Sequence, residues 1–235
     1  MSTESCEARN YLLREIEECS PKEVESQSLR FEPRPGQLLL TQGQVAEWVL
    51  FPTSGLISCF RSLGHRRVEV QQVGCDGVLG LHVALTLTGR EESTTSIVQT
   101  AGQMVGLPPR LVRLLILNRP PIGEILHNYL LGQALETHEV LTRATACSIV
   151  TRLAFWIVRA DARLNKGSIN ITHDALSDIH CVRRPSMTVA LQQLEGMGAI
   201  RSLRGQIVVL DREVLREAAE MPVHGKSLPV LERLA

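Results

Sequence analysis

The residues of this chain best suited to recognition chemistry are two neighbouring arginines, Arg183 and Arg184, followed at once by Pro185. A guanidinium group can donate two parallel hydrogen bonds to a guanine base. Proline is tolerated at the first position of a helix, where its missing N–H would have no intrahelical partner. We therefore predict a helix that starts just after the two arginines and presents them at its N-terminal end.

The predicted helix has one apolar and one outward face. Its apolar residues follow the i, i+3, i+4, i+7 spacing of a buried face: Met187, Ala190, Leu191 and Leu194. The outward face carries Arg184, Pro185, Thr188, Val189, Gln192 and Gln193. A shorter helical pattern, "THDALSDIH", precedes it with Thr172 as its cap, and a turn through Cys181 and Val182 joins the two.

Two short helices joined by a tight turn are typical of the helix-turn-helix, whose second helix reaches base edges in the major groove. Gly196 and Gly198 end the second helix, and "AIRSL" and "QIVVL" then predict a hairpin, or wing, around Arg204 and Gly205. We expect Arg204 to approach a phosphate. Two alternatives remain open: an ordinary α+β domain with solvated arginines, and a winged domain that docks a protein instead of DNA.

The elements before this segment must position it. An unbroken helical pattern follows "NRPP", with one stripe formed by Ile122, Leu126, Tyr129, Gln133, Val140, Ala144 and Cys147. We interpret this stripe as a two-fold dimer seam, which Gln133 and Glu136 interrupt; the alternative is a helix packed wholly inside its own subunit. A further helix is expected over residues 149–164.

The region upstream of the long helix has a β-rich texture. Short runs such as "QLLL", "EWVLF", "LISCF", "RVEVQQV" and "SIVQT" alternate with glycines, which predicts a sandwich or barrel. One or two short amphipathic helices are expected in the first thirty residues.

Length and composition indicate a folded protein of two domains without a membrane-spanning segment. With 235 residues, 44% of them apolar, the chain can form two folded domains. No apolar run approaches the roughly 20 residues that cross a bilayer, and six irregularly spaced cysteines without a secretory signal favour the cytoplasm. The 25 basic and 25 acidic residues balance, yet the stretch from Ile179 to Gln206 holds four arginines and one acid.

The segment "ITHDALSDIHCVRRPSMTVALQQLEGMGAIRSLRGQIVVLD" resembles the C-terminal domain of the Crp/Fnr family of bacterial transcription regulators. "RPGQLLLTQGQVAEWVLFPTSGLI" is similar to the family's cyclic-nucleotide-binding-like β-roll, or jelly roll. The resemblance implies an α+β fold with an N-terminal helical segment (1–30), a β-roll sensor domain (31–118), a dimerisation helix (119–147), a winged helix-turn-helix domain (148–221) and a tail (222–235).

The family motif also implies roles for single residues. Base-reading positions fall at Arg184, Pro185, Thr188 and Val189, and Ser186 is a phosphate contact. Arg183 is a second candidate for guanine, Val189 can pack on a thymine methyl group, and Gln192 and Arg204 complete the predicted DNA-binding set. Because the best-known members have Glu and Arg where this chain has Pro185 and Val189, we expect a different operator sequence.

The sensor lacks the residues with which relatives bind cyclic nucleotides. Leu81 and His82 stand in the Gly-Glu acceptor region, Thr95 and Ser96 replace the arginine-containing phosphate motif, and Arg90 is offset. We expect no cyclic AMP and no cofactor. Cys6 and Cys19 are too few for an iron–sulfur cluster, and a lone histidine such as His82 is weak support for haem.

Two further sites are weaker candidates. Cys181, beside the arginines, is a possible redox site, against the alternative of a small buried turn residue. His173 and His180 flank Asp174 and Asp178, for which solvated side chains are the favoured interpretation over a surface metal site.

The motifs of common enzymes are missing, and we expect no enzyme. The predicted function is a cytoplasmic, homodimeric regulator that binds a pseudo-palindromic operator in double-stranded DNA. RNA polymerase and a small-molecule effector are further candidate partners, and no membrane is expected.

Overall fold

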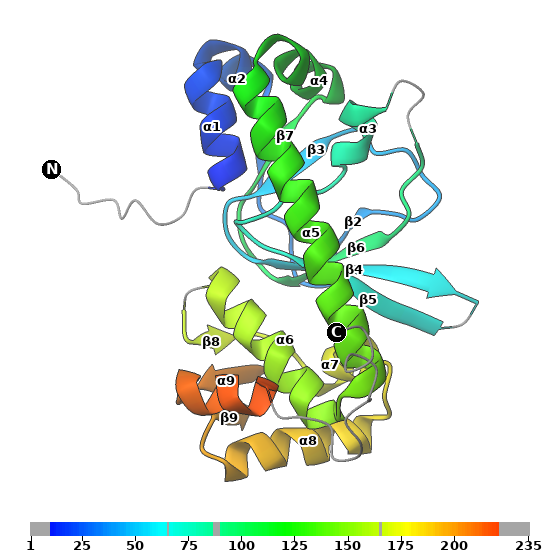
Figure 1. Ribbon diagram of the computed structural model, residues 1–235, viewed down its shortest axis with the longest axis vertical. Helices are drawn as coiled ribbons and strands as arrows, with labels where there is room; N and C mark the ends of the chain where they lie inside the picture. The colour runs from blue at the N-terminus through cyan, green and yellow to red at the C-terminus, as the bar shows by residue number, and fades with distance from the viewer. Residues whose placement is uncertain (1–9, 65, 87–89, 165, 221–235) are drawn as a thin grey trace, which may run out of the picture.

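The computed structural model describes residues 10–64, 66–86, 90–164 and 166–220. Two β-sheets with flanking helices occupy one end of the molecule, and a small winged domain occupies the other (Figure 1). The long helix α5 (Pro120–Ala146) connects them. The expected α+β fold class is confirmed. The tail predicted for residues 222–235 lies outside the described residues.

The N-terminal β-roll consists of two antiparallel sheets, with strand orders β1-β7-β3 and β2-β6-β4-β5. The strands are β1 (Leu29–Phe31), β2 (Leu38–Leu40), β3 (Val49–Pro52), β4 (Leu56–Leu63), β5 (Arg66–Val73), β6 (Thr95–Thr100) and β7 (Met104–Leu107), and the short helix α3 (Leu81–Leu85) lies between β5 and β6. The β-prone runs of the sequence fall on β2 to β6. The short strands β1 and β7 were not predicted.

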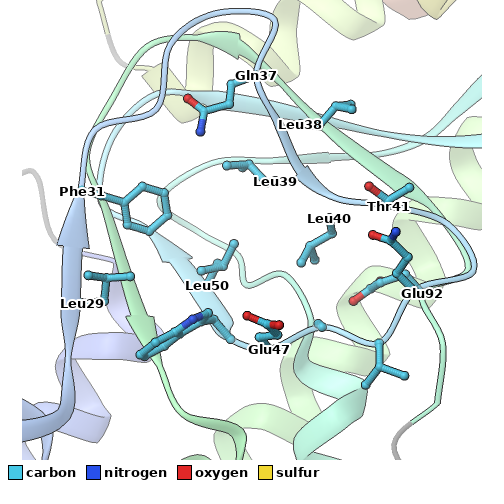
Figure 2. Close-up of a pocket in the computed structure, with 14 residues that line it drawn as sticks. Leu29, Phe31, Gln37, Leu38, Leu39, Leu40, Thr41, Glu47, Leu50 and Glu92 are labelled. Atoms are coloured by element: carbon cyan, nitrogen blue, oxygen red, sulfur yellow. The ribbon is translucent and has the colours of Figure 1, made fainter.

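Successive side chains of a strand point to opposite faces of its sheet, and the β-roll therefore has two separate apolar cores. In β3, Val49 and Phe51 face the flanking helices, whereas Leu50 faces the interior of the roll with Ile57 and Cys59. The covering helices are α1 (Tyr11–Cys19), α2 (Pro21–Gln27), α4 (Pro109–Asn118) and the first half of α5. The interior of the roll also contains a pocket (Figure 2).

Helix α5 packs differently along its length. Ile122, Leu126 and Tyr129 are buried within their own subunit, so the predicted dimer seam is wrong for these positions. The second half instead exposes leucines on another face: Leu130, Leu131, Leu135 and Leu141. None of the helices in the described part of the chain is long and apolar enough to cross a membrane.

The C-terminal unit is a winged helical domain. It comprises α6 (Ile149–Leu164), β8 (Ser168–Ile169), α7 (His173–Ile179), α8 (Arg184–Gly196), β9 (Ile200–Leu203), β10 (Gln206–Val209) and α9 (Arg212–Glu220). Its core continues into the β-roll, because Leu56 and Phe60 of β4 belong to the same apolar cluster as Leu153 and Trp156 of α6. Strand β8 and helix α9 were not predicted from the sequence.

Candidate nucleic-acid interface

Helix α7 begins as its capping residue predicts. The Thr172 hydroxyl accepts a hydrogen bond from the Ala175 N–H at 3.1 Å, and Asp174 lies in the first turn. Leu176 and Ile179 are buried against the domain core. The tight turn that follows has Cys181 in the left-handed backbone region, with φ of 54°. This turn fixes the angle between α7 and the next helix.

Helix α8 starts one residue earlier than expected. Arg183 is its cap and Arg184 its first residue, so Pro185 occupies the second position. Proline at the second position costs no intrahelical hydrogen bond, because the N–H groups of the whole first turn lack intrahelical partners. The predicted apolar face is correct: Met187, Ala190, Leu191 and Leu194 are all buried.

The predicted DNA-binding set lies mostly on one exposed surface. Its exposed members are Arg183, Arg184, Pro185, Ser186, Val189 and Gln192 on α8 and Arg204 on the wing. Thr188 is half-buried, and its hydroxyl donates a hydrogen bond to the Arg184 carbonyl at 3.1 Å. Thr188 therefore has less exposed surface for contact with a base than its neighbours, and its hydroxyl proton is already used in this hydrogen bond.

The two arginines differ in their surroundings. Arg184 Nε lies 3.2 Å from a carboxylate oxygen of Asp174, and both side chains are about two-thirds exposed. Arg183 makes no ion pair with any residue that the structure describes. Arg183 is thus available to an external anion, whereas Arg184 already pairs with Asp174 through Nε.

The wing is attached firmly to the helices. Strands β9 and β10 pair around Arg204 and Gly205, and β8 adds a third strand on the other side of β10. Glu195 at the end of α8 accepts the Ser202 N–H at 2.6 Å, and His173 Nε2 lies 3.0 Å from the Ser202 hydroxyl. The position of Arg204 relative to α8 is therefore set by hydrogen bonds between side chains and the wing.

Comparison with known proteins supports this arrangement. Residues 151–218 match the model of the Crp-like helix-turn-helix domain. The resemblance to the Crp/Fnr family is confirmed. The comparison with curated proteins gave no match.

Solved structures extend the Crp/Fnr likeness to most of the chain. FixK2 from Bradyrhizobium japonicum has a TM-score of 0.69 at 16% identity, covering 86% of this chain and 99% of its own. A putative Crp/Fnr regulator from Eubacterium rectale gives 0.68 at 13% identity, covering 90% and 98%. A Crp/Fnr-family transcriptional regulator from Thermus thermophilus gives 0.66 at 20% identity, covering 83% and 100%. At these identities the comparison shows the Crp/Fnr fold.

The β-roll residues considered for nucleotide binding lie on two elements of this Crp/Fnr-type fold. Leu81 and His82 lie on α3, and Thr95 and Ser96 lie on β6. His82 Nε2 is 3.0 Å from the Arg90 carbonyl oxygen, while Ser96 Oγ lies 3.4 Å from Cys59 Sγ inside the roll.

The weaker candidates are also placed. Cys181 is exposed, so the alternative of a buried turn residue is wrong. His180 is half-buried as a residue, but burial of its ring and the charge of Arg152 lower its pKa to about 3, so it stays neutral beside Trp156. Among the described residues there is no group of three or more metal-ligating side chains.

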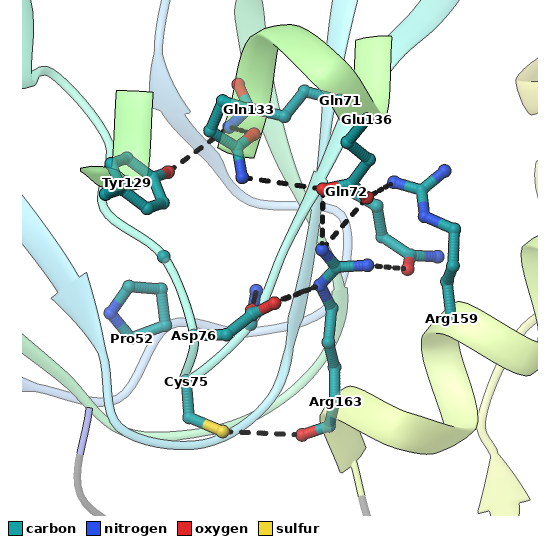
Figure 3. A network of polar contacts seen from close by, with 12 residues as sticks. Pro52, Gln71, Gln72, Cys75, Asp76, Tyr129, Gln133, Glu136, Arg159 and Arg163 are labelled. Atoms are coloured by element: carbon teal, nitrogen blue, oxygen red, sulfur yellow. Dashed lines mark hydrogen bonds and ion pairs between the residues drawn. The ribbon is translucent and has the colours of Figure 1, made fainter. Parts of the chain in front are cut away.

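The sequence did not reveal a polar cluster between the β-roll and the winged domain, which we call the junction cluster. Figure 3 shows the part of it around Arg163. Its members come from three elements and the loop after β5: Glu69, Gln72, Asp76, Glu136, Trp156, Arg159 and Arg163. The one sequence signal for it is the spacing of Arg159 and Arg163, which lie four residues apart and therefore on the same face of α6.

Arg163 is the centre of the junction cluster. Its side chain is only 8% exposed and contacts Glu136 of α5, Asp76 and Gln72, with distances of 3.0 to 3.1 Å. Arg159, one turn earlier, also pairs with Glu136. The long helix, the β-roll and the winged domain thus meet around the buried Arg163 side chain.

Proposed function

We propose that this protein is a transcription regulator that binds a pseudo-palindromic DNA operator as a homodimer. The observation that carries the proposal is the placement of Arg183 and Arg184 at the exposed N-terminal end of α8, next to a wing that carries Arg204. In helix-turn-helix proteins this helix end reaches base edges in the major groove.

The contacts divide into two classes. Arg183 and Arg184 are the candidates for bidentate hydrogen bonds to guanine, and Val189, 52% exposed, for contact with a thymine methyl group. Ser186 and Arg204 are assigned to phosphates, which position the protein without reading sequence. Pro185, Thr188 and Gln192 lie on the same outward face and complete the surface.

A second copy of the chain would cover the exposed face of α5. Leu131 and Leu135 are 56% and 60% exposed and lie one turn apart, and Leu130 and Leu141, 43% and 61% exposed, lie along an adjacent stripe of the same helix. Two copies related by a two-fold axis along this helix would present two α8 helices to the same side. Binding to one duplex requires these helices to reach major grooves roughly 34 Å apart.

The sensor would act through the junction cluster. A change in the β-roll that shifts Gln72 or Asp76 alters the environment of Arg163 and thereby the orientation of the winged domain. We infer a regulatory role for the β-roll on this basis, and we assign no cyclic nucleotide to it.

The test is selection of bound sequences from random duplex DNA with the full chain at moderate salt. We expect a two-fold symmetric motif. Affinity for that motif should fall with salt at a slope of about −0.9 per phosphate contacted, and Arg204→Ala should reduce the slope by about one.

Arg110→Ala is the matched control, because Arg110 is exposed on α4 in the β-roll part of the chain. It should leave the slope unchanged. An asymmetric single half-site would refute the homodimer, and a failure to enrich any motif would favour a protein partner for the winged domain.

A further inference from the structure

The β-roll contains a pocket that none of the residues considered for nucleotide binding lines (Figure 2). Its volume is about 310 Å³, near the lower limit for small-molecule sites. The walls come from β1, β2, the loop that follows β2, β3 and Glu92, which precedes β6. Leu81, His82, Thr95 and Ser96 are not among the lining residues. The space is therefore a separate candidate site.

The pocket combines apolar walls with carboxylates. Leu38, Leu40 and Leu50 contribute aliphatic surface, and Phe31 and Trp48 contribute aromatic surface. Both charged side chains that line it are acidic, Glu47 and Glu92, and no arginine or lysine of the described residues does so. Aromatic rings and carboxylates both attract cations.

Glu92 is the unusual member of this lining. It is only 7% exposed, and Figure 2 shows its side chain on the pocket wall. Its backbone is fixed, because Glu92 N–H donates to the Gln44 carbonyl at 2.7 Å and Gly43 N–H donates to the Glu92 carbonyl at 2.9 Å. The backbone of Glu92 is thus anchored to the loop after β2, whose Gln44 also lines the pocket.

The carboxylate of Glu92 lacks a strong internal partner. Its Oε1 makes no hydrogen bond with any described residue, and the nearest cation candidate, His82 Nε2, is 3.6 Å away and contacts the Arg90 carbonyl instead. Burial raises the pKa of Glu92, and His82 opposes this rise. A buried carboxylate without full hydrogen bonding is costly, so a cation at this point would be bound favourably.

We propose that this pocket binds a small apolar amine or ammonium compound, with the cationic group at Glu92 and the apolar part against the leucines and aromatic rings. The same carboxylate disfavours anions such as nucleotides. Binding itself is independent of DNA. Its use as a regulatory signal rests on the proposed function, because only an operator-binding protein has DNA affinity to regulate.

The first experiment is calorimetric titration of the full chain, without DNA, at pH 8. Three probes share one alkyl chain and differ in charge: hexylammonium, hexanol and hexanoate. We expect saturable binding of hexylammonium, at least tenfold weaker binding of hexanol and none of hexanoate, as a charge-assisted hydrogen bond in a buried site implies. Equal binding of hexanol, stronger binding of hexanoate, or no saturable binding of hexylammonium overturns the proposal.

Variants locate the site. Glu92→Gln should weaken hexylammonium binding at least tenfold, whereas Glu91→Gln, an exposed neighbour outside the pocket, should stay within twofold of the original protein. Leu38→Lys changes a 56% exposed lining residue, so folding is retained, and its ammonium should weaken binding at least fivefold. Retained binding in either pocket variant overturns the assignment, and Leu38→Lys decides if Glu92→Gln does not fold.

A second measurement separates the ligand site from DNA binding. Operator affinity is measured with and without saturating hexylammonium in the original protein and in Glu92→Gln. A change confined to the original protein supports a regulatory site. Amine binding without any operator binding would refute the proposed function and leave the pocket assignment intact.

Discussion

The substitution Glu69→Gln tests how the β-roll and the winged domain are joined. Glu69 lies on β5 beneath α6 and is only 8% exposed. Its Oε2 accepts a hydrogen bond from Trp156 Nε1–H at 2.8 Å. Burial raises the pKa of this carboxyl group from 4.5 to about 7, against the opposing effects of Arg159 and of the Trp156 hydrogen bond. Between about pH 4.5 and 7 the folded protein therefore keeps a proton on Glu69 that the unfolded chain releases.

The raised pKa of Glu69 makes the stability of the folded protein depend on pH, with a sign and size that follow from proton linkage. Below the unfolded value of 4.5 both states are protonated and the carboxyl group makes no pH-dependent difference. As the pH rises toward 7, the unfolded chain ionises first, so the folded state loses stability. At about 1.4 kcal/mol per pKa unit, the full loss above pH 7 is about 3 kcal/mol.

Glutamine keeps an oxygen that accepts the Trp156 N–H but never ionises. We expect Glu69→Gln to be more stable than the original protein by about 3 kcal/mol at pH 8.5 and nearly equal at pH 4.5. The assay is urea denaturation across this pH range at fixed protein concentration, with exposed Glu124→Gln as control. A destabilisation that is the same at both pH values would refute the reasoning.

Three other substitutions test the remaining contacts. Asp174→Asn frees Arg184 from an exposed ion pair and should tighten operator binding by at most about fivefold in a gel-shift titration; weaker binding would contradict this. If the chain forms the proposed dimer, Leu135→Glu should convert it to monomer in analytical ultracentrifugation, whereas Leu117→Glu, 68% exposed on α4, should not. An intact Leu135→Glu dimer would place the interface elsewhere. Arg163→Met leaves buried polar partners uncompensated and should lower the free energy of unfolding by about 3 to 5 kcal/mol; a loss below about 1 kcal/mol would show that the junction cluster contributes little.

Local patterns predicted the winged domain well. The cap at Thr172, the turn, and the apolar spacing of α8 depend on neighbours within a few residues, and the structure has all three. Helix α9 was not predicted, because two of its three buried residues, Ala218 and Ala219, are alanines, which give only a weak apolar signal. The roles of the exposed DNA-binding residues stay predictions.

Features that depend on tertiary packing were not predictable in the same way. Helix α5 has apolar residues on more than one side, and only the packing of α1, α4 and the sheet decides that Leu126 is buried and Leu131 exposed. The junction cluster joins residues far apart in the chain, such as Glu69 and Trp156, whose spacing carries no signal. The pocket at Glu92 likewise requires the loop before β3 to fold over it.

The junction cluster limits how far the winged domain can turn. Helices α5 and α6 meet at Cys147 and Ser148, and the pairing of Glu136 with Arg163 joins them again. These contacts lie about 16 Å along α5 and about 22 Å along α6 from the bend. Because α5 and α6 are joined both at this bend and by the Glu136–Arg163 pair, the angle between the two helices stays fixed as long as the pair is intact. A turn of the winged domain about this bend would therefore have to begin with the separation of Glu136 from both Arg163 and Arg159, and it would occur in one step and not by gradual bending.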